Sequence, residues 1–292
     1  MEQKNILSKK KHVGKDILHF ALLIVGAIVL AVIFRIFFFT SFRIPTPSME
    51  PTIVAGDHIM VNKSIPGARI FKDFNFIETG KRPNIYRCKG IRNIKRNDVL
   101  VFNFPYYDWN RLNFDMNTYY VKRCVAIPGD TFYIDNGIYK VKNSTCILGH
   151  YHNQQQWVAS ENLSSYYSFP YDTKLNWTML NFGPLYIPKK GDCLPIGTQN
   201  ISLYRRLIEY ETAGEVEIRK DSIFLNGIHM THYRFDTNYY FMTGDLVSDS
   251  QDSRYWGIVP EDHIVGKAAF VWKSKDGHTK KMRWNRVFKQ IK

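Results

Sequence analysis

TYYVKRCVAIPGDTFYIDNGIYKV, residues 118–141, is a run of strand-forming residues interrupted by two turn sequences. Aromatic and β-branched side chains fill the uninterrupted parts, whereas Pro128-Gly129-Asp130 and Asn136-Gly137 are typical of tight turns. The same pattern returns in four further segments, HIMVNKSI (58–65), DVLVFNF (98–104), DSIFLNGI (221–228) and IVGKAAFVW (264–272). The sequence therefore predicts a mostly β domain built from short strands and hairpins.

Residues from about 140 to 215 differ from this pattern, because they are polar and aromatic with weak periodicity. We interpret this segment as an insertion, a cap, in the β domain. It is expected to contain the one helix outside the N-terminal region, around Thr198 to Tyr210.

One N-terminal segment is suited to crossing a membrane. Residues 17–34, ILHFALLIVGAIVLAVIF, carry no charge, and Arg35 is followed by a further apolar run, IFFF. At about 1.5 Å per residue, a helix over 17–39 spans the roughly 30 Å of a bilayer core. A cleavable secretory signal has a shorter apolar core and a small-x-small cleavage site, and a soluble core helix is apolar along one stripe only. Neither alternative fits, so we expect an uncleaved, single-pass transmembrane helix.

Basic residues dominate the segment ahead of this helix, where only Glu2 and Asp16 oppose them: Lys4, Lys9, Lys10, Lys11 and Lys15. By the positive-inside rule, the N-terminus is expected in the cytoplasm. The expected organisation is a cytoplasmic N-terminus (1–16), a transmembrane anchor (17–39) and an extracytoplasmic β-rich domain (40–292) that contains the insertion.

The whole chain is strongly basic, with 40 Lys and Arg against 26 Asp and Glu and a formal net charge of +14. Such a charge favours an acidic partner, either nucleic acid or an anionic lipid surface. No helix-turn-helix, zinc-finger or RNA-binding motif accompanies it, whereas a membrane segment does. We therefore expect a phospholipid membrane as a partner and no nucleic acid.

The four cysteines stand far apart without a C-x-x-C pair: Cys88, Cys124, Cys146 and Cys193. This spacing indicates neither a zinc site nor a redox motif, and it leaves the disulfide state open. No cluster of ligands suggests a metal or an organic cofactor, so none is expected.

A candidate nucleophile follows the membrane segment directly, in IPTPSMEPT, residues 44–52. The three prolines of this segment restrict the backbone and make it stiff. Ser48 is thereby held in a restricted conformation and loses little conformational freedom when it attacks a carbonyl, which suits a nucleophilic hydroxyl. The alternative is a proline-rich linker that carries an ordinary surface serine.

A serine nucleophile needs a base, and none of the nine histidines lies in a convincing triad setting. Lys122 is the candidate, because strand alternation would turn it inward with Tyr120 and Cys124 while Arg123 stays solvated on the other face. Burial would favour the neutral amine, and lowering the pKa of a lysine from about 10.4 to about 8 costs roughly 3 kcal/mol. The alternative is a pair of basic residues on an exposed strand.

These segments together resemble type I signal peptidases, a bacterial family of Ser-Lys serine proteases. The similar segments occur in family order: Pro47-Ser48-Met49-Glu50-Pro51-Thr52, Gly56-Asp57-His58-Ile59-Met60-Val61-Asn62-Lys63, Arg96-Asn97-Asp98-Val99-Leu100-Val101-Phe102 with Tyr120-Val121-Lys122-Arg123 and Pro128-Gly129-Asp130, and Asp252-Ser253-Arg254-Tyr255-Trp256-Gly257. The resemblance covers about residues 40–132 and 241–270 and leaves the insertion unmatched.

The resemblance implies a membrane-anchored endopeptidase that removes signal peptides from exported preproteins at the outer face of the bacterial inner membrane, with its catalytic domain in the periplasm. It assigns Ser48 as nucleophile and Lys122 as general base. The other implied roles are an oxyanion contact from Thr46, orientation of Lys122 by Ser250, structural support from Asp252 and Arg254, and substrate pockets lined by Phe42, Ile44 and Val121. Trp109, Phe114 and Met116 are candidates for lipid contact or for an ordinary hairpin.

The sequence departs from the family at one place, where Leu246-Val247 stands for the usual Asn-Arg. Local support and substrate preference are expected to differ there. Two alternatives therefore stay open, a catalytically inactive membrane-tethered binding protein on the same fold and a related Ser-Lys protease with a dedicated substrate.

Overall fold

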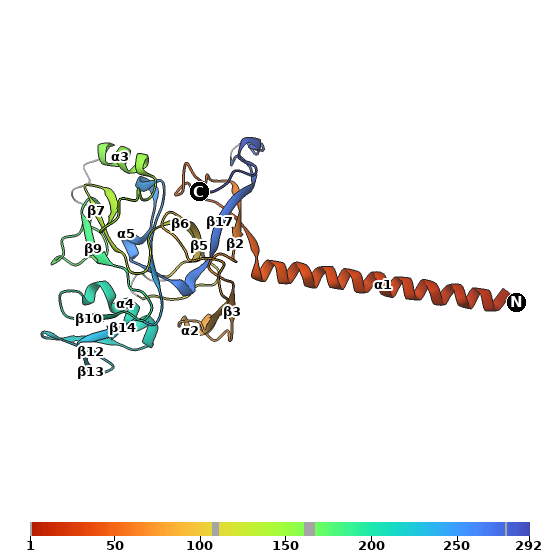
Figure 1. Cartoon of the computed structure of the whole chain (residues 1–292), viewed down its shortest axis with the longest axis horizontal. Helices are drawn as coiled ribbons and strands as arrows, with labels where there is room; N and C mark the ends of the chain where they lie inside the picture. Colours follow the sequence, from red (N-terminus) through yellow and green to blue (C-terminus); the bar gives the residue numbers. More distant parts are fainter. Residues whose placement is uncertain (1, 107–110, 161–166, 278) are drawn as a thin grey trace.

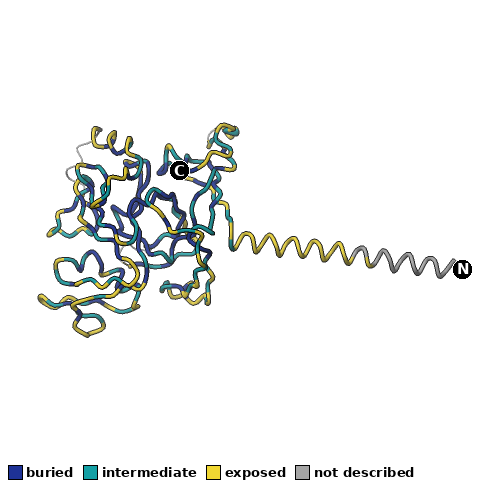
Figure 2. Tube along the Cα trace, viewed as in Figure 1, coloured by how far each residue is buried: buried dark blue, intermediate teal, exposed yellow. Residues whose placement is uncertain are grey.

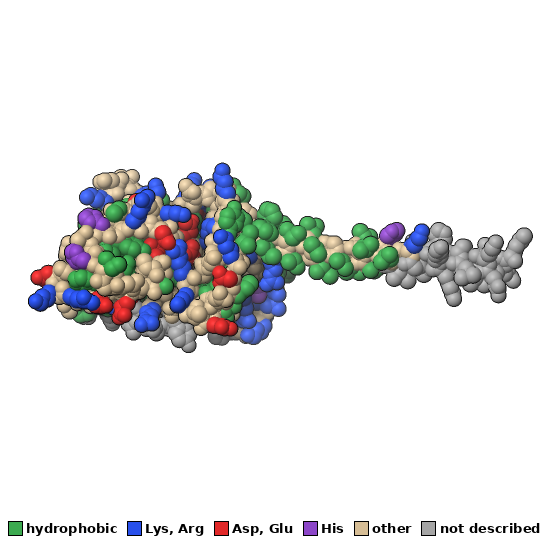
Figure 3. Space-filling view, turned by 90° about the horizontal axis from the view of Figure 1, so that it is seen from below, with side chains coloured by type: hydrophobic (Ala, Val, Ile, Leu, Met, Phe, Trp, Pro, Cys, Tyr) green, Lys and Arg blue, Asp and Glu red, His purple; other side chains and the backbone are tan. Residues whose placement is uncertain are grey.

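The computed structural model describes residues 2–106, 111–160, 167–277 and 279–292. One long helix, α1 (Glu2–Phe37), projects from a β-rich domain (Figure 1). Its segment Leu18–Phe37 has a mean hydropathy of 2.8, and no part of that window is buried in the protein. Among the described residues, it is the one helix long and apolar enough to cross a membrane. The exposed trace in Figure 2 and the hydrophobic side chains in Figure 3 follow this helix to the domain.

The junction between helix and domain lies slightly before the predicted end of the anchor at Phe39. The helix ends at Phe37, and Phe39 already belongs to strand β1 (Phe39–Arg43), where it pairs with Asn62 of the neighbouring strand. Lys63 Nζ donates to the carbonyls of Arg35 at 2.9 Å and Ile36 at 3.4 Å. A cation at the last carbonyls of a helix is favourable, so this contact stabilises the helix end against the sheet.

The central sheet has seven antiparallel strands in the order β1-β2-β17-β5-β6-β15-β16. The strands after β1 are β2 (Asp57–Asn62), β5 (Val99–Asn103), β6 (Tyr119–Ala126), β15 (Tyr239–Thr243), β16 (Val259–Pro260) and β17 (Ile264–Ser274). Strands β2, β5, β6 and β17 thus lie in segments for which the sequence pattern predicted strands. The mostly β fold with one N-terminal apolar helix is confirmed.

Smaller sheets surround the central one. They comprise β8-β7-β9 (Ile138–Val141, Thr131–Asp135, Phe182–Tyr186), β11-β12-β13 (Val216–Arg219, Ser222–Leu225, Ile228–Met230), β10-β14 (Cys193–Pro195, His232–Arg234) and β3-β4 (Arg69–Phe71, Ile85–Arg87). The predicted turn at Asn136-Gly137 connects β7 to β8, and a second Asn-Gly pair, Asn226-Gly227, connects β12 to β13. Positive φ at Asn136 and Asn226 explains why asparagine stands there.

The short helices are α2 (Phe76–Thr79), α3 (Tyr151–Ser160), α4 (Ile201–Thr212) and α5 (Ser253–Trp256), with 3-10 turns η2 (Val247–Asp249), η3 (Glu261–His263) and η4 (Trp284–Arg286). The predicted helix around 198–210 corresponds to α4. The expectation of a single helix outside the anchor was wrong, since α2, α3 and α5 form as well. Helix α3 was not predicted because its sequence lacks an apolar stripe. It is held instead through Gln154, which donates to Leu148 O at 2.7 Å and accepts from Tyr139 N at 3.0 Å.

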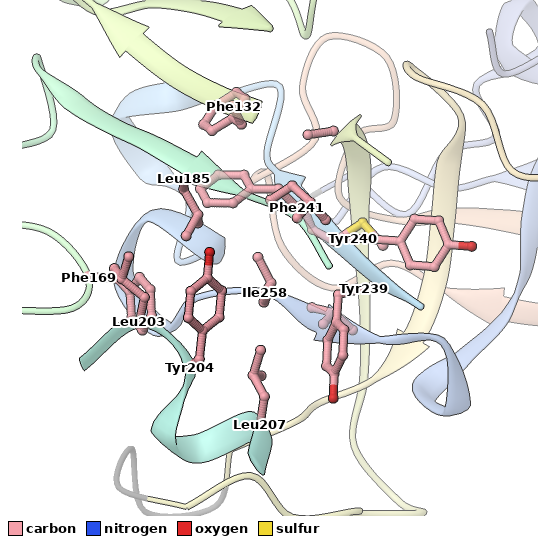
Figure 4. Packing of buried hydrophobic residues seen from close by; sticks show 14 of the residues in the cluster. Phe132, Phe169, Leu185, Leu203, Tyr204, Leu207, Tyr239, Tyr240, Phe241 and Ile258 are labelled. Carbon is pink, nitrogen blue, oxygen red and sulfur yellow. The ribbon is translucent and has the colours of Figure 1, made fainter. Parts of the chain in front are cut away.

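The main core joins the central sheet to the β7–β9 sheet and to α4. Phe132 and Phe241 stack with ring centroids 4.3 Å apart, and Leu185, Tyr204 and Leu207 pack in the same cluster (Figure 4). A second apolar cluster lies between β1, β2, β5 and β17. Both cores hold the sheet rigid at the places where its strands lead into the loops described next.

Of the three candidates for lipid contact, Trp109 lies outside the described residues. Phe114 is buried against the rings of Phe76 and His263, which favours the alternative of an ordinary hairpin over lipid contact for this residue. All four cysteines are free thiols, and only Cys124 is buried, which agrees with its place in a strand pattern.

Candidate active site

Ser48 lies in the loop between β1 and β2, where it is 9% exposed. The loop bends sharply, with Glu50 N donating to Pro47 O at 2.7 Å and Ile53 N donating to Met49 O at 2.9 Å. The side chains of Met49 and Ile53 are buried in the second apolar cluster. The backbone around Ser48 is therefore fixed from both sides.

Lys122 comes from β6, 74 residues further along the chain, and reaches the same point. Its Nζ donates a hydrogen bond of 2.6 Å to Ser48 Oγ, and Lys122 is only 3% exposed. The Nζ atom lies 5.7 Å from the Tyr120 ring centroid, and Cys124 is buried further along the strand. The geometry brings the predicted nucleophile and base into direct contact.

Burial controls the protonation of this lysine. Removal from water is the largest influence and lowers the pKa of Lys122 to about 8; the negative charge of Asp252 raises it and the positive charge of Arg254 lowers it further. A neutral amine is therefore accessible a little above neutral pH, which an exposed lysine does not offer.

Arg123 does not stay in solvent as the alternation of the strand predicted. It is buried, and its guanidinium donates to both carboxylate oxygens of Asp245, at 2.7 and 2.6 Å. Thr52 Oγ1 donates to the same carboxylate at 2.5 Å. The prediction failed because both faces of β6 are covered by other segments. The ion pair connects β6 to the loop after β15 and, through Thr52, to the nucleophile loop.

Asp252 and Arg254 form a second buried ion pair beneath the site. Arg254 Nε and Nη2 donate to the two Asp252 oxygens at 2.8 and 2.9 Å, and Gly244 N donates to Asp252 at 2.9 Å. Burial alone would raise the pKa of Asp252, but the Arg254 charge and these hydrogen bonds lower it overall. The carboxylate therefore stays ionised and faces Lys122 with a negative charge.

Ser250 lies beside this pair, and its hydroxyl donates to Asp252 Oδ2 at 2.8 Å. Within the described part of the chain, its hydrogen bond goes to Asp252, and none joins it to Lys122. A Cβ at Gly244 would overlap Ser250 Oγ and approach Ser48 O, so only glycine allows these three segments to meet. Ser250 thus lies at the site, hydrogen-bonded to the carboxylate whose charge acts on the lysine.

The remaining predicted residues lie around Ser48. Thr46 is exposed two residues before it. Phe42 and Val121 pack at the edge of the second apolar cluster, in which Ile44 is buried, so the three proposed pocket residues belong to or adjoin the same cluster. Phe42 also contacts the Tyr119 ring at 4.9 Å between centroids.

The departure at Leu246-Val247 is accommodated by packing. Val247 is buried with Trp157 and Met179, and the Arg254 guanidinium lies 5.4 Å from the Trp157 ring centroid. Leu246 N donates to Ser48 O at 3.1 Å. The contacts of Val247 and Arg254 involve Trp157 of α3, which the sequence did not indicate as part of the site, because the polar sequence of α3 carries no local signal for this position.

Asp252→Ala is expected to destabilise the protein by about 3–5 kcal/mol, because it leaves the Arg254 charge buried without its partner. Denaturant unfolding of the detergent-solubilised chain measures this change. Glu217→Ala, which breaks an exposed pair with Arg219, is the control and is expected to cost about 0–1 kcal/mol. A loss below about 1 kcal/mol for Asp252→Ala would contradict the supporting role of the pair.

Among the described residues, no group of three or more His, Cys, Asp or Glu side chains is arranged to hold a metal ion. The arrangement instead offers a hydroxyl nucleophile, a buried amine and an ionised carboxylate. Together these suit acyl transfer by a serine and a lysine.

The chain is similar to a family of known peptidases. The profile of the family described as signal peptidase, peptidase S26 matches residues 17–273. Signal peptidase I of Buchnera aphidicola (Schizaphis graminum) is 30% identical over 256 residues, covering 83% of this chain and 70% of the relative. Signal peptidase I of Haemophilus influenzae is 29% identical, covering 90% and 73%. The Helicobacter pylori (strain J99) enzyme of the same name is 26% identical, covering 91% and 90%.

Proposed function

The chain belongs to the signal peptidase family S26, and we propose that Ser48 and Lys122 carry out its reaction, the removal of N-terminal signal peptides from exported preproteins. The chain is a membrane-anchored serine endopeptidase. The observation that supports the two roles most directly is the 2.6 Å contact between Lys122 Nζ and Ser48 Oγ inside a buried site.

In the proposed reaction, neutral Lys122 takes the proton of the Ser48 hydroxyl as Ser48 Oγ attacks the scissile carbonyl. The lysine then gives this proton to the leaving amine, and an acyl-enzyme remains on Ser48. A water molecule, deprotonated by the same amine, hydrolyses the ester and frees Ser48. The Ser48 backbone N–H and the Thr46 hydroxyl are the proposed donors to the oxyanion.

Asp252 and Ser250 have different roles in this scheme. The Asp252 charge stabilises the lysinium that forms while the proton is on Lys122. Burial has the opposite effect, because it favours the neutral amine before the attack. Ser250, bonded to Asp252, is proposed to orient the lysine, and Arg254 keeps Asp252 ionised in the protein interior.

The substrate is proposed to bind as an added strand. β1 lies at the edge of the central sheet, and the segment that follows it leads to Ser48. An extended peptide can pair with such an edge and place alternate side chains in pockets. Phe42, Ile44 and Val121 would contact the small side chains that precede the cleavage site.

The apolar helix supports a fixed position for the enzyme. We propose that residues 1–16 lie in the cytoplasm, that 17–39 cross the bacterial inner membrane, and that 40–292, with the insertion at 140–215, lie on the periplasmic side. The partners in this scheme are preprotein signal peptides and the phospholipid membrane, and the reaction requires no cofactor, metal or nucleic acid.

Cleavage of a preprotein with an Ala-x-Ala site tests the proposal. The detergent-solubilised chain is expected to cut after the second alanine, as read by mass spectrometry of the new N-terminus. The control is the same preprotein with bulky residues in place of both alanines, and it should stay intact. Binding without cleavage would favour the inactive binding protein, and cleavage of one dedicated substrate alone would favour a specialised Ser-Lys protease.

A further inference from the structure

Helix α3 of the inserted segment touches both loops of the active site through one side chain. Asn153 Nδ2 donates to the carbonyl of Glu50 at 3.1 Å and to the carbonyl of Asp245 at 2.8 Å. Glu50 lies two residues after Ser48, and Asp245 follows Gly244 in the loop that leads to Ser250. A single amide group therefore bridges the nucleophile loop and the loop behind the lysine.

This bridge lies between two other connections of the same loops. Leu246 N donates to Ser48 O at 3.1 Å, and Thr52 Oγ1 donates to Asp245 Oδ2 at 2.5 Å. The loops are thus joined at positions 48, 50 and 52. Asn153 supplies the middle connection, from the inserted segment, whereas Arg123 of β6 reinforces the connection at Thr52 and Asp245.

The helix that carries Asn153 is itself held firmly. Besides the two bonds of Gln154 to β8 and the preceding loop, Asn97 holds the turn that begins α3, donating to Ile147 O at 2.7 Å and accepting from Gly149 N at 2.9 Å. On the next turn of the helix, Trp157 packs against Val247 and the Arg254 guanidinium. Asn153 therefore acts from a rigid support.

We propose that Asn153 is a positioning residue of the reaction, which holds the Ser48 loop at its working distance from Lys122. This inference rests on the proposed function of the dyad. A primary amide has two N–H donors and can satisfy two carbonyls at once, which no hydroxyl can do. The inserted segment thereby completes the active site instead of only covering it.

The consequence for catalysis follows from the geometry of attack. A displacement of about 1 Å in the position of a reacting group can cost a factor on the order of 100 in rate. Without Asn153, the loop keeps its connections at Ser48 and Thr52 and the turn bond from Glu50 N to Pro47 O, but the Glu50 carbonyl loses its bond to the inserted segment. The nucleophile would then sample positions away from Lys122, and water would reach the amine more easily.

The experiment compares Asn153→Ala and Asn153→Asp with Gln155→Ala, a neighbour that is exposed on the same helix. Full-length, detergent-solubilised enzyme cleaves the Ala-x-Ala preprotein at several pH values. Both Asn153 variants are expected to lose kcat by about ten-fold or more with KM changed less than about three-fold. The rising limb of the pH profile should move above its wild-type midpoint, because hydration of Lys122 raises its pKa. Gln155→Ala should match the wild type.

Asn153→Asp keeps the shape of the side chain but places an oxygen against two carbonyls, so it supplies the measurement if Asn153→Ala does not fold. Rates are expressed per folded enzyme, from the melting curve of each variant. If both variants match Gln155→Ala in kcat and in pH midpoint, Asn153 is only structural and the inference is overturned. If wild type and Gln155→Ala are both inactive, the proposed function itself fails, and the inference fails with it.

Discussion

Ser48→Ala is expected to reduce cleavage to background, a loss on the order of 10⁵-fold in kcat, because it removes the atom that forms the acyl-enzyme. The fold should persist, since the substitution deletes one hydroxyl whose hydrogen bond is to Lys122. Single-turnover cleavage of the preprotein, with enzyme in excess, measures the residual rate without interference from product release.

Ser248→Ala is the matched control, because Ser248 is an exposed serine on the nearby turn η2. It is expected to keep activity within about two-fold of the wild type, as surface substitutions away from a site do. Substantial cleavage by Ser48→Ala would mean that another group forms the acyl-enzyme, or that none does.

Lys122→Met is expected to be as inactive as Ser48→Ala but more stable than the wild type near neutral pH. A lysine with a pKa of about 8 in the folded chain and 10.5 when unfolded binds its proton less well in the folded state. The free energy of unfolding rises with pH wherever the unfolded state holds more protons than the folded state. The destabilisation caused by burying Lys122 is therefore complete below pH 8 and disappears above about pH 10.5. The shift corresponds to about 3 kcal/mol.

Denaturant unfolding at pH 7 and at pH 10 measures this difference. Lys122→Met should have a higher free energy of unfolding than the wild type at pH 7, and this difference should be smaller at pH 10. Lys122→Arg provides the control for charge, because a guanidinium keeps its proton and cannot act as a base. Activity in Lys122→Arg would contradict the assignment of Lys122, and a Lys122→Met variant less stable than wild type at pH 7 would contradict the cost of its burial.

The sequence predicted the strands from local patterns, whereas the roles of Ser48 and Lys122 came from the resemblance to a family. Alternating and β-branched residues indicate strands wherever one face is buried, and the order of Ser48, Lys122 and the Asp252 segment follows the family. The inward direction of Lys122 could be read from the apolar residues at Tyr120 and Cys124. These predictions needed no knowledge of which strands are neighbours.

The exceptions depend on contacts between distant segments. Arg123 is buried because the carboxylate of Asp245, more than a hundred residues away in the sequence, neutralises its charge. No local sequence pattern reveals such a partner. Helix α3 has a polar sequence, and its stability comes from bonds of Gln154 and packing of Trp157 against other elements. Asn153 could not be placed at the site from its sequence position, because only the folded chain brings it to Glu50.

The pH dependence of kcat/KM for wild-type cleavage of the Ala-x-Ala preprotein, from pH 6 to 10, tests the central claim most directly. The proposed dyad predicts a rate that rises about ten-fold per pH unit at low pH and levels off around a midpoint near 8, the pKa of Lys122. Ser48→Ala should be inactive throughout. A flat profile, or a midpoint near the ordinary lysine value of 10.5, would contradict a buried neutral Lys122 as the base that activates Ser48.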